Sequence, residues 1–227
     1  MQIPRYPDDP CLIITDAGLP SLILSAMLSE QQSSKDQQRS ILYPAWWTSQ
    51  SDMDLLVPAI DRAVDMQADL LTLGVDRDHA GYPEDSTDAS NATLGVHQSR
   101  MLLDAAALAI KLGFKRVLWP IHIQESTEDA QRLSQISTAI DRSILAARLA
   151  TLDAQSQGGV EVTIETPLVD LTDQQLADIA ADLNVPITSC WWTDHALPQA
   201  ETESARWNKE SQTASMLETR PAQHTRV

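Results

Sequence analysis

The chain has 227 residues, enough for one domain with a full hydrophobic core, and it carries 32 Asp and Glu against 16 Lys and Arg. The resulting net charge of −16 argues against general binding to nucleic acid or to an anionic membrane surface. Two cysteines, no basic-then-apolar leader and no long apolar segment predict a cytoplasmic protein without a disulfide framework or a membrane span.

The first strand and helix enclose a turn on which much of the interpretation depends. Residues 11–14 are an uninterrupted apolar run, typical of a strand covered on both faces, and a helical pattern begins at Leu19. Asp16 and Gly18 lie in the small-residue turn between them, and Pro20 falls in the first helical turn, where its missing N–H removes no helical hydrogen bond. At the carboxyl end of a parallel strand such a turn can receive a nucleotide phosphate. The alternative is a tight turn with no ligand.

Strands and helices alternate along the rest of the chain. Further strands are expected at residues 41–47, 70–75, 116–123 and 160–164. Helices are expected after Ser51 or Asp52, over 100–112, over 127–154, and after Thr172, which opens a capping-box sequence. Parallel strands need such crossovers, so the pattern predicts a doubly wound, Rossmann-like α/β sheet of five parallel strands with helices on both faces.

Polarity assigns the remaining segments. Residues 1–9 are expected to form an N-terminal arm, 10–194 a single α/β domain, and 195–227 a disordered tail. The polar stretch 76–92 is either a site loop or a mobile lid. Within the 127–154 helix, apolar residues recur at threes and fours and predict one buried face: Leu133, Ile136, Ile140, Ile144 and Ala147.

A family resemblance rests on the segment from Glu165 to Cys190, which carries an E-T-P-L run, a capped helix, a V-P turn and an S-C pair. This order resembles the C-terminal signature of the 7-cyano-7-deazaguanine synthases, ligases of queuosine biosynthesis in the PP-loop ATP pyrophosphatase superfamily. The family's phosphate loop, S-G-G-x-D-S, aligns with residues 16–21, where Gly18 and Ser21 are retained.

The resemblance implies a PP-loop or HUP-type fold, ATP and Mg²⁺ as cofactors, and a nucleotide or deazapurine-like ligand. It places the cofactor-binding residues in the first turn and at the arginine of the family's P-G-R-N turn: Asp16, Ala17, Gly18, Ser21 and Arg100. The departures predict weak ATP binding. Pro20 replaces the loop's aspartate, Asp16 places a carboxylate near the expected phosphate, and zinc is expected to be absent because Cys190 is the single cysteine of the C-terminal region.

Other candidates come from their positions at the expected ends of strands. Trp46, together with Trp47, Trp191 and Trp192, could sandwich a purine-like ring, although core or dimer-interface packing is the commoner use of tryptophan and leaves a homodimer open. His122, with His79 and His97, could converge on one cleft or lie on the surface. Glu165 could contact substrate or be a structural carboxylate. We therefore predict Trp46, His122 and Glu165 as substrate-binding residues, and assign no catalytic residue and no metal ligand.

Two functions remain open from the sequence. One is an ATP-dependent ligase-like enzyme with a degenerate phosphate loop. The other is a non-catalytic module that kept the fold, lost ATP turnover and binds a ligand or a partner.

Overall fold

The computed structural model describes residues 9–32, 39–47, 53–81, 91–124, 128–155, 159–193 and 200–208. Its elements follow in the order β1 (Leu12–Thr15), α1 (Leu19–Gln32), β2 (Ile41–Pro44), α2 (Met53–Leu71), β3 (Gly74–Val75), α3 (Asn91–Leu112), β4 (Arg116–Leu118), α4 (Asp129–Gln155), β5 (Thr163–Glu165) and α5 (Asp173–Asp182). Two 3₁₀ turns, η1 (Ile187–Ser189) and η2 (Trp191–Thr193), follow α5, and residues 200–208 are helical.

The five strands form one parallel sheet in the order β3-β2-β1-β4-β5. β1 lies at its centre, with Leu12 opposite Ile41 of β2 on one side and opposite Val117 of β4 on the other. This arrangement confirms the prediction of a doubly wound, five-stranded α/β sheet. It also places the β1–α1 turn where the strand order reverses, which is the usual position of a ligand crevice in such sheets.

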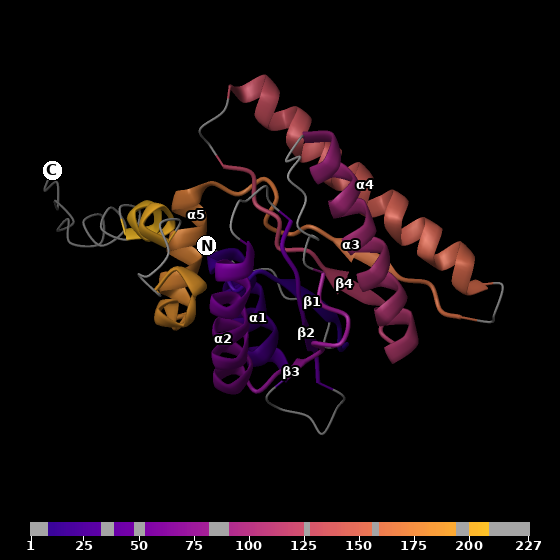
Figure 1. Ribbon diagram of the computed structural model, residues 1–227, viewed down its shortest axis with the longest axis horizontal. Helices are drawn as coiled ribbons and strands as arrows, with labels where there is room; N and C mark the ends of the chain where they lie inside the picture. The colour runs from indigo at the N-terminus through magenta and orange to yellow at the C-terminus, as the bar shows by residue number, and fades with distance from the viewer. Residues whose placement is uncertain are drawn as a thin grey trace, which may run out of the picture.

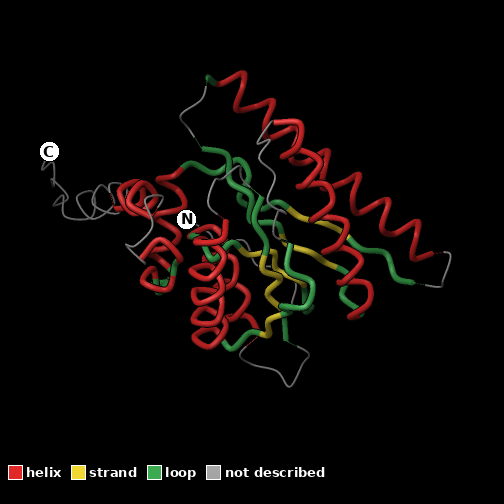
Figure 2. The backbone as a smooth tube through the Cα atoms, in the orientation of Figure 1, coloured by secondary structure: helices red, strands yellow, loops and turns green. Residues whose placement is uncertain are grey.

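Side chains of β1 point alternately into two hydrophobic cores. Cys11 and Ile13 pack with α1, α2 and α5, while Leu12 and Ile14 pack with α3 and α4. Figure 1 shows these two groups of helices on opposite sides of the sheet, and Figure 2 shows the short strands between them. Because both faces of β1 are covered, its sequence is an unbroken apolar run instead of an alternating one.

Several element boundaries differ from the sequence-based prediction. Leu70 belongs to α2 and is 56% exposed, so the expected third strand is reduced to Gly74–Val75. The helix ends because Thr72 adopts a left-handed φ of 59° and the Leu73 N–H bonds to Ala68 O. The other strands are also shorter than expected or shifted, since β2, β4 and β5 span three or four residues each.

The third helix begins at Asn91, not at Arg100. Arg100 is therefore an exposed side chain in the middle of α3 and does not lie at a helix N-terminus. Of the polar stretch 76–92, residues 82–90 lie outside the described part of the chain, and Gly81 forms an isolated bridge with Ala45.

Helix α4 buries a different face from the predicted one. Leu133 and Ile144 are 66% and 55% exposed, whereas small residues pack inward: Ala139, Ser143, Ala146, Ala147, Ala150 and Thr151. Of the five predicted core positions, only Ala147 is fully buried, while Ile136 and Ile140 are half-buried. The prediction of that buried face is therefore wrong for Leu133 and Ile144, which lie on the outer side of α4.

The C-terminal segment is more ordered than the sequence indicated. Residues 200–208 form a helix in which Ala200 and Trp207 are 0% and 3% exposed. The expectation of disorder from residue 195 onward is therefore wrong for this segment. The rest of the tail and residues 1–8 of the N-terminal arm lie outside the described residues. Within the described ranges, no helix has the length and apolarity needed to cross a lipid bilayer.

Candidate functional site

A cavity of about 130 Å³ lies at the carboxyl ends of the central strands. Four predicted site residues line it: Asp16 and Gly18 from the β1–α1 turn, Trp46 after β2, and His122 after β4. The remaining lining residues are Pro20, Trp47, Pro120, Trp191, Trp192, Glu203, Arg206 and Trp207. Segments far apart in the sequence therefore meet at the topological switch point of the sheet.

Several donors of the β1–α1 turn are bonded to acceptors within the turn itself. Asp16 Oδ1 accepts the Gly18 N–H at 2.8 Å and lies 3.0 Å from the Ser21 hydroxyl, which is also 2.9 Å from Gly18 O. A Cβ at Gly18 would lie 2.9 Å from Asp16 Oδ1, so this close approach requires glycine. Ala17, at a φ of 57°, donates its N–H to Thr15 Oγ1 at 3.0 Å. The Ala17 and Gly18 N–H groups and the Ser21 hydroxyl, three donors that a phosphate could use, are therefore already bonded within the turn.

The Asp16 carboxyl group titrates near neutral pH. Burial raises its pKa to about 6, the bonds from the Gly18 N–H and Ser21 oppose that rise, and the charge of Glu203 adds to it. No ion pair joins Asp16 to a cation among the residues that the structure describes. The cavity thus contains a carboxylate whose charge is not neutralised within the described part of the protein.

The Ala17 carbonyl is held from two further elements. Gln67 Nε2 on α2 donates to Ala17 O at 3.1 Å and to Ser189 O at 3.2 Å, and the Trp191 N–H donates to Ala17 O at 3.2 Å. Gln67 is fully buried. These bonds fix the turn against α2 and the segment after α5. Sequence reasoning missed Gln67, although its spacing from Ile60, Ala63 and Val64 places a polar residue on the buried face of α2.

Tryptophan rings form one wall of the cavity. Trp46 and Trp191 meet edge to face at 5.7 Å, Trp191 and Trp192 at 6.0 Å, and Trp192 stacks on Trp207 at 6.4 Å. Each of these rings is at most 4% exposed, and Trp46 Nε1 has no hydrogen-bond partner among the described residues. His97 Nε2 on α3 donates to Trp46 O at 2.6 Å and so fixes the backbone that carries the Trp46 ring.

A charged cluster beside Trp207 also lines the cavity. Arg206 donates to Asp173 through Nε and Nη2, both at 2.7 Å, and Arg206 Nη2 lies 3.2 Å from His122 Nδ1. His122 Nε2 donates to Leu171 O at 3.1 Å, which leaves Nδ1 as the acceptor of the neutral ring. Burial, followed by the charge of Arg206, lowers the pKa of His122 to about 4. Burial opposes ionisation of Asp173, but the hydrogen bonds and charge of Arg206 outweigh it and lower that pKa.

The other predicted residues lie elsewhere. Glu165, at the end of β5, accepts hydrogen bonds from Arg116 Nε at 2.8 Å and Nη2 at 2.9 Å, which indicates a structural ion pair. His79 pairs with Asp76 on an exposed turn. Neither these residues nor Arg100 are among those that line the cavity in the described part of the chain.

Sequence reasoning also missed Glu203, Arg206 and Trp207, because residues 195–227 were expected to be disordered. The buried residues Ala200 and Trp207 are seven positions apart, a spacing that places both on one face of a helix. That spacing is compatible with a helix but is too sparse a signal to predict one.

Metal ligation has no candidate cluster within the described residues, where no group of three or more His, Cys, Asp or Glu side chains could hold an ion. Cys11 and Cys190 are buried free thiols. Burial raises both pKa values, that of Cys11 to about 11, so neither thiol ionises readily at neutral pH.

Comparison with known proteins identifies the fold. No protein-family model and no curated protein matches the sequence. Among solved structures, the chain is similar to the U34-tRNA thiolase NcsA from Methanococcus maripaludis with its 4Fe-4S cluster, at a TM-score of 0.50 and 12% identity. The match covers 97% of this chain and 76% of the thiolase chain. At this identity the likeness concerns the fold alone, a five-stranded parallel α/β sheet with helices on both faces.

Proposed function

We propose that this protein binds a planar, nitrogen-rich ring of the purine or deazapurine class in the tryptophan-lined cavity and does not turn over ATP. The observation that carries the proposal is the 2.8 Å hydrogen bond from the Gly18 N–H to Asp16 Oδ1. It puts a carboxylate oxygen where a PP-loop would bind a phosphate oxygen, so the anion site at the start of α1 is filled from within the chain.

A phosphate group would have to displace this carboxylate or lie beside it. Two like charges about 4 Å apart repel by about 1 to 4 kcal/mol at the dielectric of water or of a protein surface. Pro20 supplies neither a backbone N–H nor a metal-binding carboxylate at the next helical position. The volume of about 130 Å³ is also well below the roughly 300 Å³ at which typical ligand pockets begin, and therefore favours a base-sized ring over a nucleoside triphosphate.

The cavity's chemistry favours a ring with N–H donors. Both described hydrogen bonds to the Asp16 side chain end on Oδ1, so Oδ2 can accept from a ligand. Neighbouring tryptophans form an apolar aromatic wall, and because each is at most 4% exposed, a ligand would have to turn one ring to gain a stacking interaction of about 1 to 3 kcal/mol per base. Purines and deazapurines present N–H groups along one edge, which matches a carboxylate at the side of an aromatic wall.

An ATP-dependent ligase of the 7-cyano-7-deazaguanine synthase type is the second candidate. The fold and the retained Gly18 and Ser21 favour it, and it would use ATP with Mg²⁺. This function requires the Asp16 carboxylate to release the Gly18 N–H and the Ser21 hydroxyl, to which it is now hydrogen-bonded. The chemistry of the tRNA thiolase does not transfer directly, because an iron–sulfur cluster is commonly held by four cysteine thiolates and this chain has two cysteines.

Isothermal titration calorimetry with 7-deazaguanine, adenine, AMP and ATP–Mg²⁺ tests the proposal. We expect the free bases to bind with a Kd below about 100 µM and ATP–Mg²⁺ to bind more weakly than about 1 mM. Asp16→Asn, which replaces Oδ2 by a donor, should weaken base binding at least about tenfold. Glu165→Gln, outside the cavity, is the control. Failure of all free bases to bind would overturn the proposal, and tight ATP–Mg²⁺ binding with turnover would establish the ligase instead.

A further inference from the structure

The outer face of α4 carries a row of exposed leucines. Leu145, Leu149 and Leu152 are 67%, 48% and 57% exposed, and Val96 on the neighbouring helix α3 is 71% exposed. Scattered exposed apolar residues are normal on a soluble protein, but a contiguous apolar stripe marks an interaction surface. This face lies on the opposite side of the sheet from α1, α2 and α5, as Figure 1 shows.

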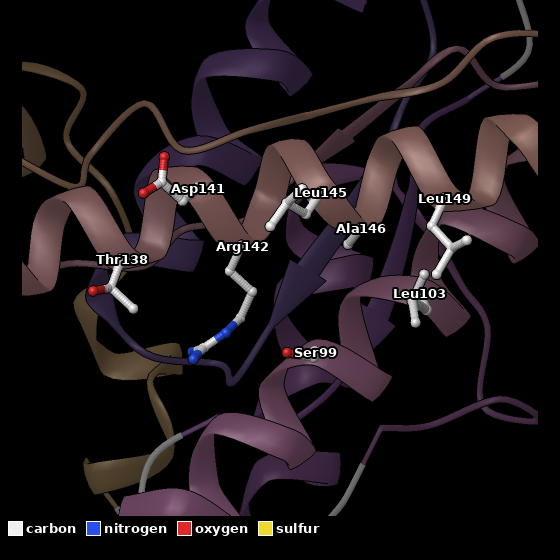
Figure 3. A pocket seen from close by; sticks show the side chains of 8 residues that line it. All are labelled: Ser99, Leu103, Thr138, Asp141, Arg142, Leu145, Ala146 and Leu149. Carbon is white, nitrogen blue, oxygen red and sulfur yellow. The ribbon is translucent and has the colours of Figure 1, made fainter.

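A groove of about 370 Å³ runs beside the stripe between α3 and α4. Figure 3 shows Leu103 of α3 and Leu149 of α4 approaching each other at one end, with Arg142 extending from α4 toward α3 at the other. Arg142 donates to Gln98 of α3. The lining is thus apolar along most of its length, and this hollow can accept an apolar side chain from another molecule.

Charged residues interrupt the stripe in a specific order. Asp141, Leu145, Arg148 and Leu152 are spaced by four, three and four residues, so they lie along one outward-facing line of the helix. All four are exposed. Neither Asp141 nor Arg148 has a hydrogen-bond or ion-pair partner in the described part of the chain.

This order is self-complementary. If a second α4 packs antiparallel to the first, with a two-fold axis between Ile144 and Leu145, Asp141 of each copy lies opposite Arg148 of the other. The two-fold axis creates two such pairs at once, and Leu145 of one copy lies beside Ile144 of the other. A symmetric dimer interface has this property, because the same patch must complement itself.

The exposed apolar side chains supply about half of the apolar area of a standard interface, which predicts a weak dimer. Fully burying an aliphatic side chain contributes about 1.5 to 3 kcal/mol. At about 25 cal/mol per Å², this corresponds to roughly 60 to 120 Å² of apolar surface removed from water. Ile144, the three leucines and Val96, each about half to two-thirds exposed, together supply roughly 200 to 300 Å². A standard interface buries about 800 Å² per partner, a little over half of it apolar. The stems of Arg142 and Arg148 and the groove supply further area.

We propose that the outer face of α4, with the groove beside α3, is the interface of a homodimer in which the two α4 helices pack antiparallel. A second copy of this chain is favoured over an unrelated partner. In the antiparallel arrangement, Asp141 and Arg148 of one copy pair with Arg148 and Asp141 of the other, so the protein itself supplies every partner charge. The interface is independent of the cavity beside Asp16, so neither proposal requires the other.

Sedimentation equilibrium of the full chain between about 1 and 200 µM tests this inference, since modest interfaces give micromolar affinities. We expect a monomer–dimer equilibrium in this range. Leu145→Glu should abolish the dimer, whereas Leu70→Glu, at an exposed leucine of α2, should leave it intact. Circular dichroism establishes that each variant is folded, and because Leu145 is 67% exposed its replacement removes no core packing.

Charge reversal makes the test specific to the antiparallel pairing. Asp141→Arg and Arg148→Asp should each weaken association at least about tenfold, because each creates two like-charge contacts. The double variant Asp141→Arg/Arg148→Asp should restore the affinity to within about threefold of the unmodified protein. A monomer at about 200 µM, a dimer that survives Leu145→Glu, or a double variant as weak as the single ones would overturn the inference.

Discussion

Arg206 and Asp173, 33 positions apart in the sequence, form a two-pronged ion pair in which both N–O distances are 2.7 Å. The pair fastens the C-terminal helix to the start of α5. Trp207, beside Arg206, stacks on Trp192 of the cavity wall, and the Arg206 guanidinium lies 4.4 Å from the centroid of the Trp207 ring. The helix at 200–208 thus contributes to the cavity and closes it.

Arg206→Met should destabilise the fold by about 2 to 4 kcal/mol, because it removes both hydrogen bonds and the positive charge of Arg206 from the mostly buried carboxylate of Asp173. Arg206 and Asp173 are 18% and 12% exposed. Urea unfolding followed by circular dichroism measures the effect. The matched control is Arg77→Met, since Arg77 pairs with Asp61 on the surface and should cost less than about 1 kcal/mol.

The double variant Arg206→Met/Asp173→Asn separates the ion pair from the packing of the arginine. It should be more stable than Arg206→Met alone, because the unpaired charge is gone. Equal losses for Arg206→Met and Arg77→Met would contradict the anchoring role of this pair.

The central part of the fold could be predicted from the sequence because it depends on local patterns. The apolar run at residues 11–14 identifies the central strand, and the capping box is present, with Thr172 Oγ1 accepting the Gln175 N–H at 3.0 Å. Both signals arise within a few neighbouring residues. The turn containing Asp16 and Gly18 was placed correctly for the same reason.

The buried face of α4 could not be read from hydrophobicity alone. Its outward leucines repeat with the same period as a core face, while alanines such as Ala139 and Ala146 pack inward, because their small side chains let α4 approach its neighbours closely. The cavity was also incomplete in the sequence, since Arg206 and Trp207 reach it through tertiary contacts that no local pattern encodes.

Asp16→Asn should stabilise the protein relative to the unmodified form, and by more at pH 6 than at pH 4. The pKa of Asp16 is about 6 in the folded protein and ordinarily 3.8, so its ionisation on folding costs stability increasingly between about pH 4 and 6. The asparagine variant lacks this cost, on the order of 2 to 3 kcal/mol when complete. The free energy of unfolding of the variant minus that of the unmodified protein should therefore increase from pH 4 to pH 6 and then level off. A difference that does not change with pH would show that Asp16 titrates normally.

His122→Gln should produce the opposite trend. The pKa of His122 falls from 6.5 to about 4 on folding, so the unfolded chain binds the extra proton between these values and the native protein gains stability as pH rises through them. Glutamine can keep the donor to Leu171 O but does not titrate. The stability of the variant relative to the unmodified protein should fall between about pH 4 and 6.5, as measured by urea unfolding at each pH. Asp16 and His122 change stability in opposite directions over the same pH range. Their effects should largely cancel, so these two groups should make the free energy of unfolding of the unmodified protein depend little on pH.

The double change Asp16→Ser/Pro20→Asp should improve ATP–Mg²⁺ binding at least about tenfold, which corresponds to about 1.4 kcal/mol. Serine at position 16 releases the Gly18 N–H and the Ser21 hydroxyl for a phosphate, and aspartate at position 20 supplies a carboxylate for the metal ion. Asp16→Ser alone should give part of the gain. Pro20→Asp alone should give none, because it adds a second negative charge while the donors remain occupied.

Calorimetry measures each affinity, and Asp104→Ser, at an exposed position of α3, controls for the change in net charge. Tight ATP–Mg²⁺ binding by the unmodified protein, with turnover of roughly 1 s⁻¹ or more, would mean that Asp16 leaves this turn readily and that the ligase function is correct.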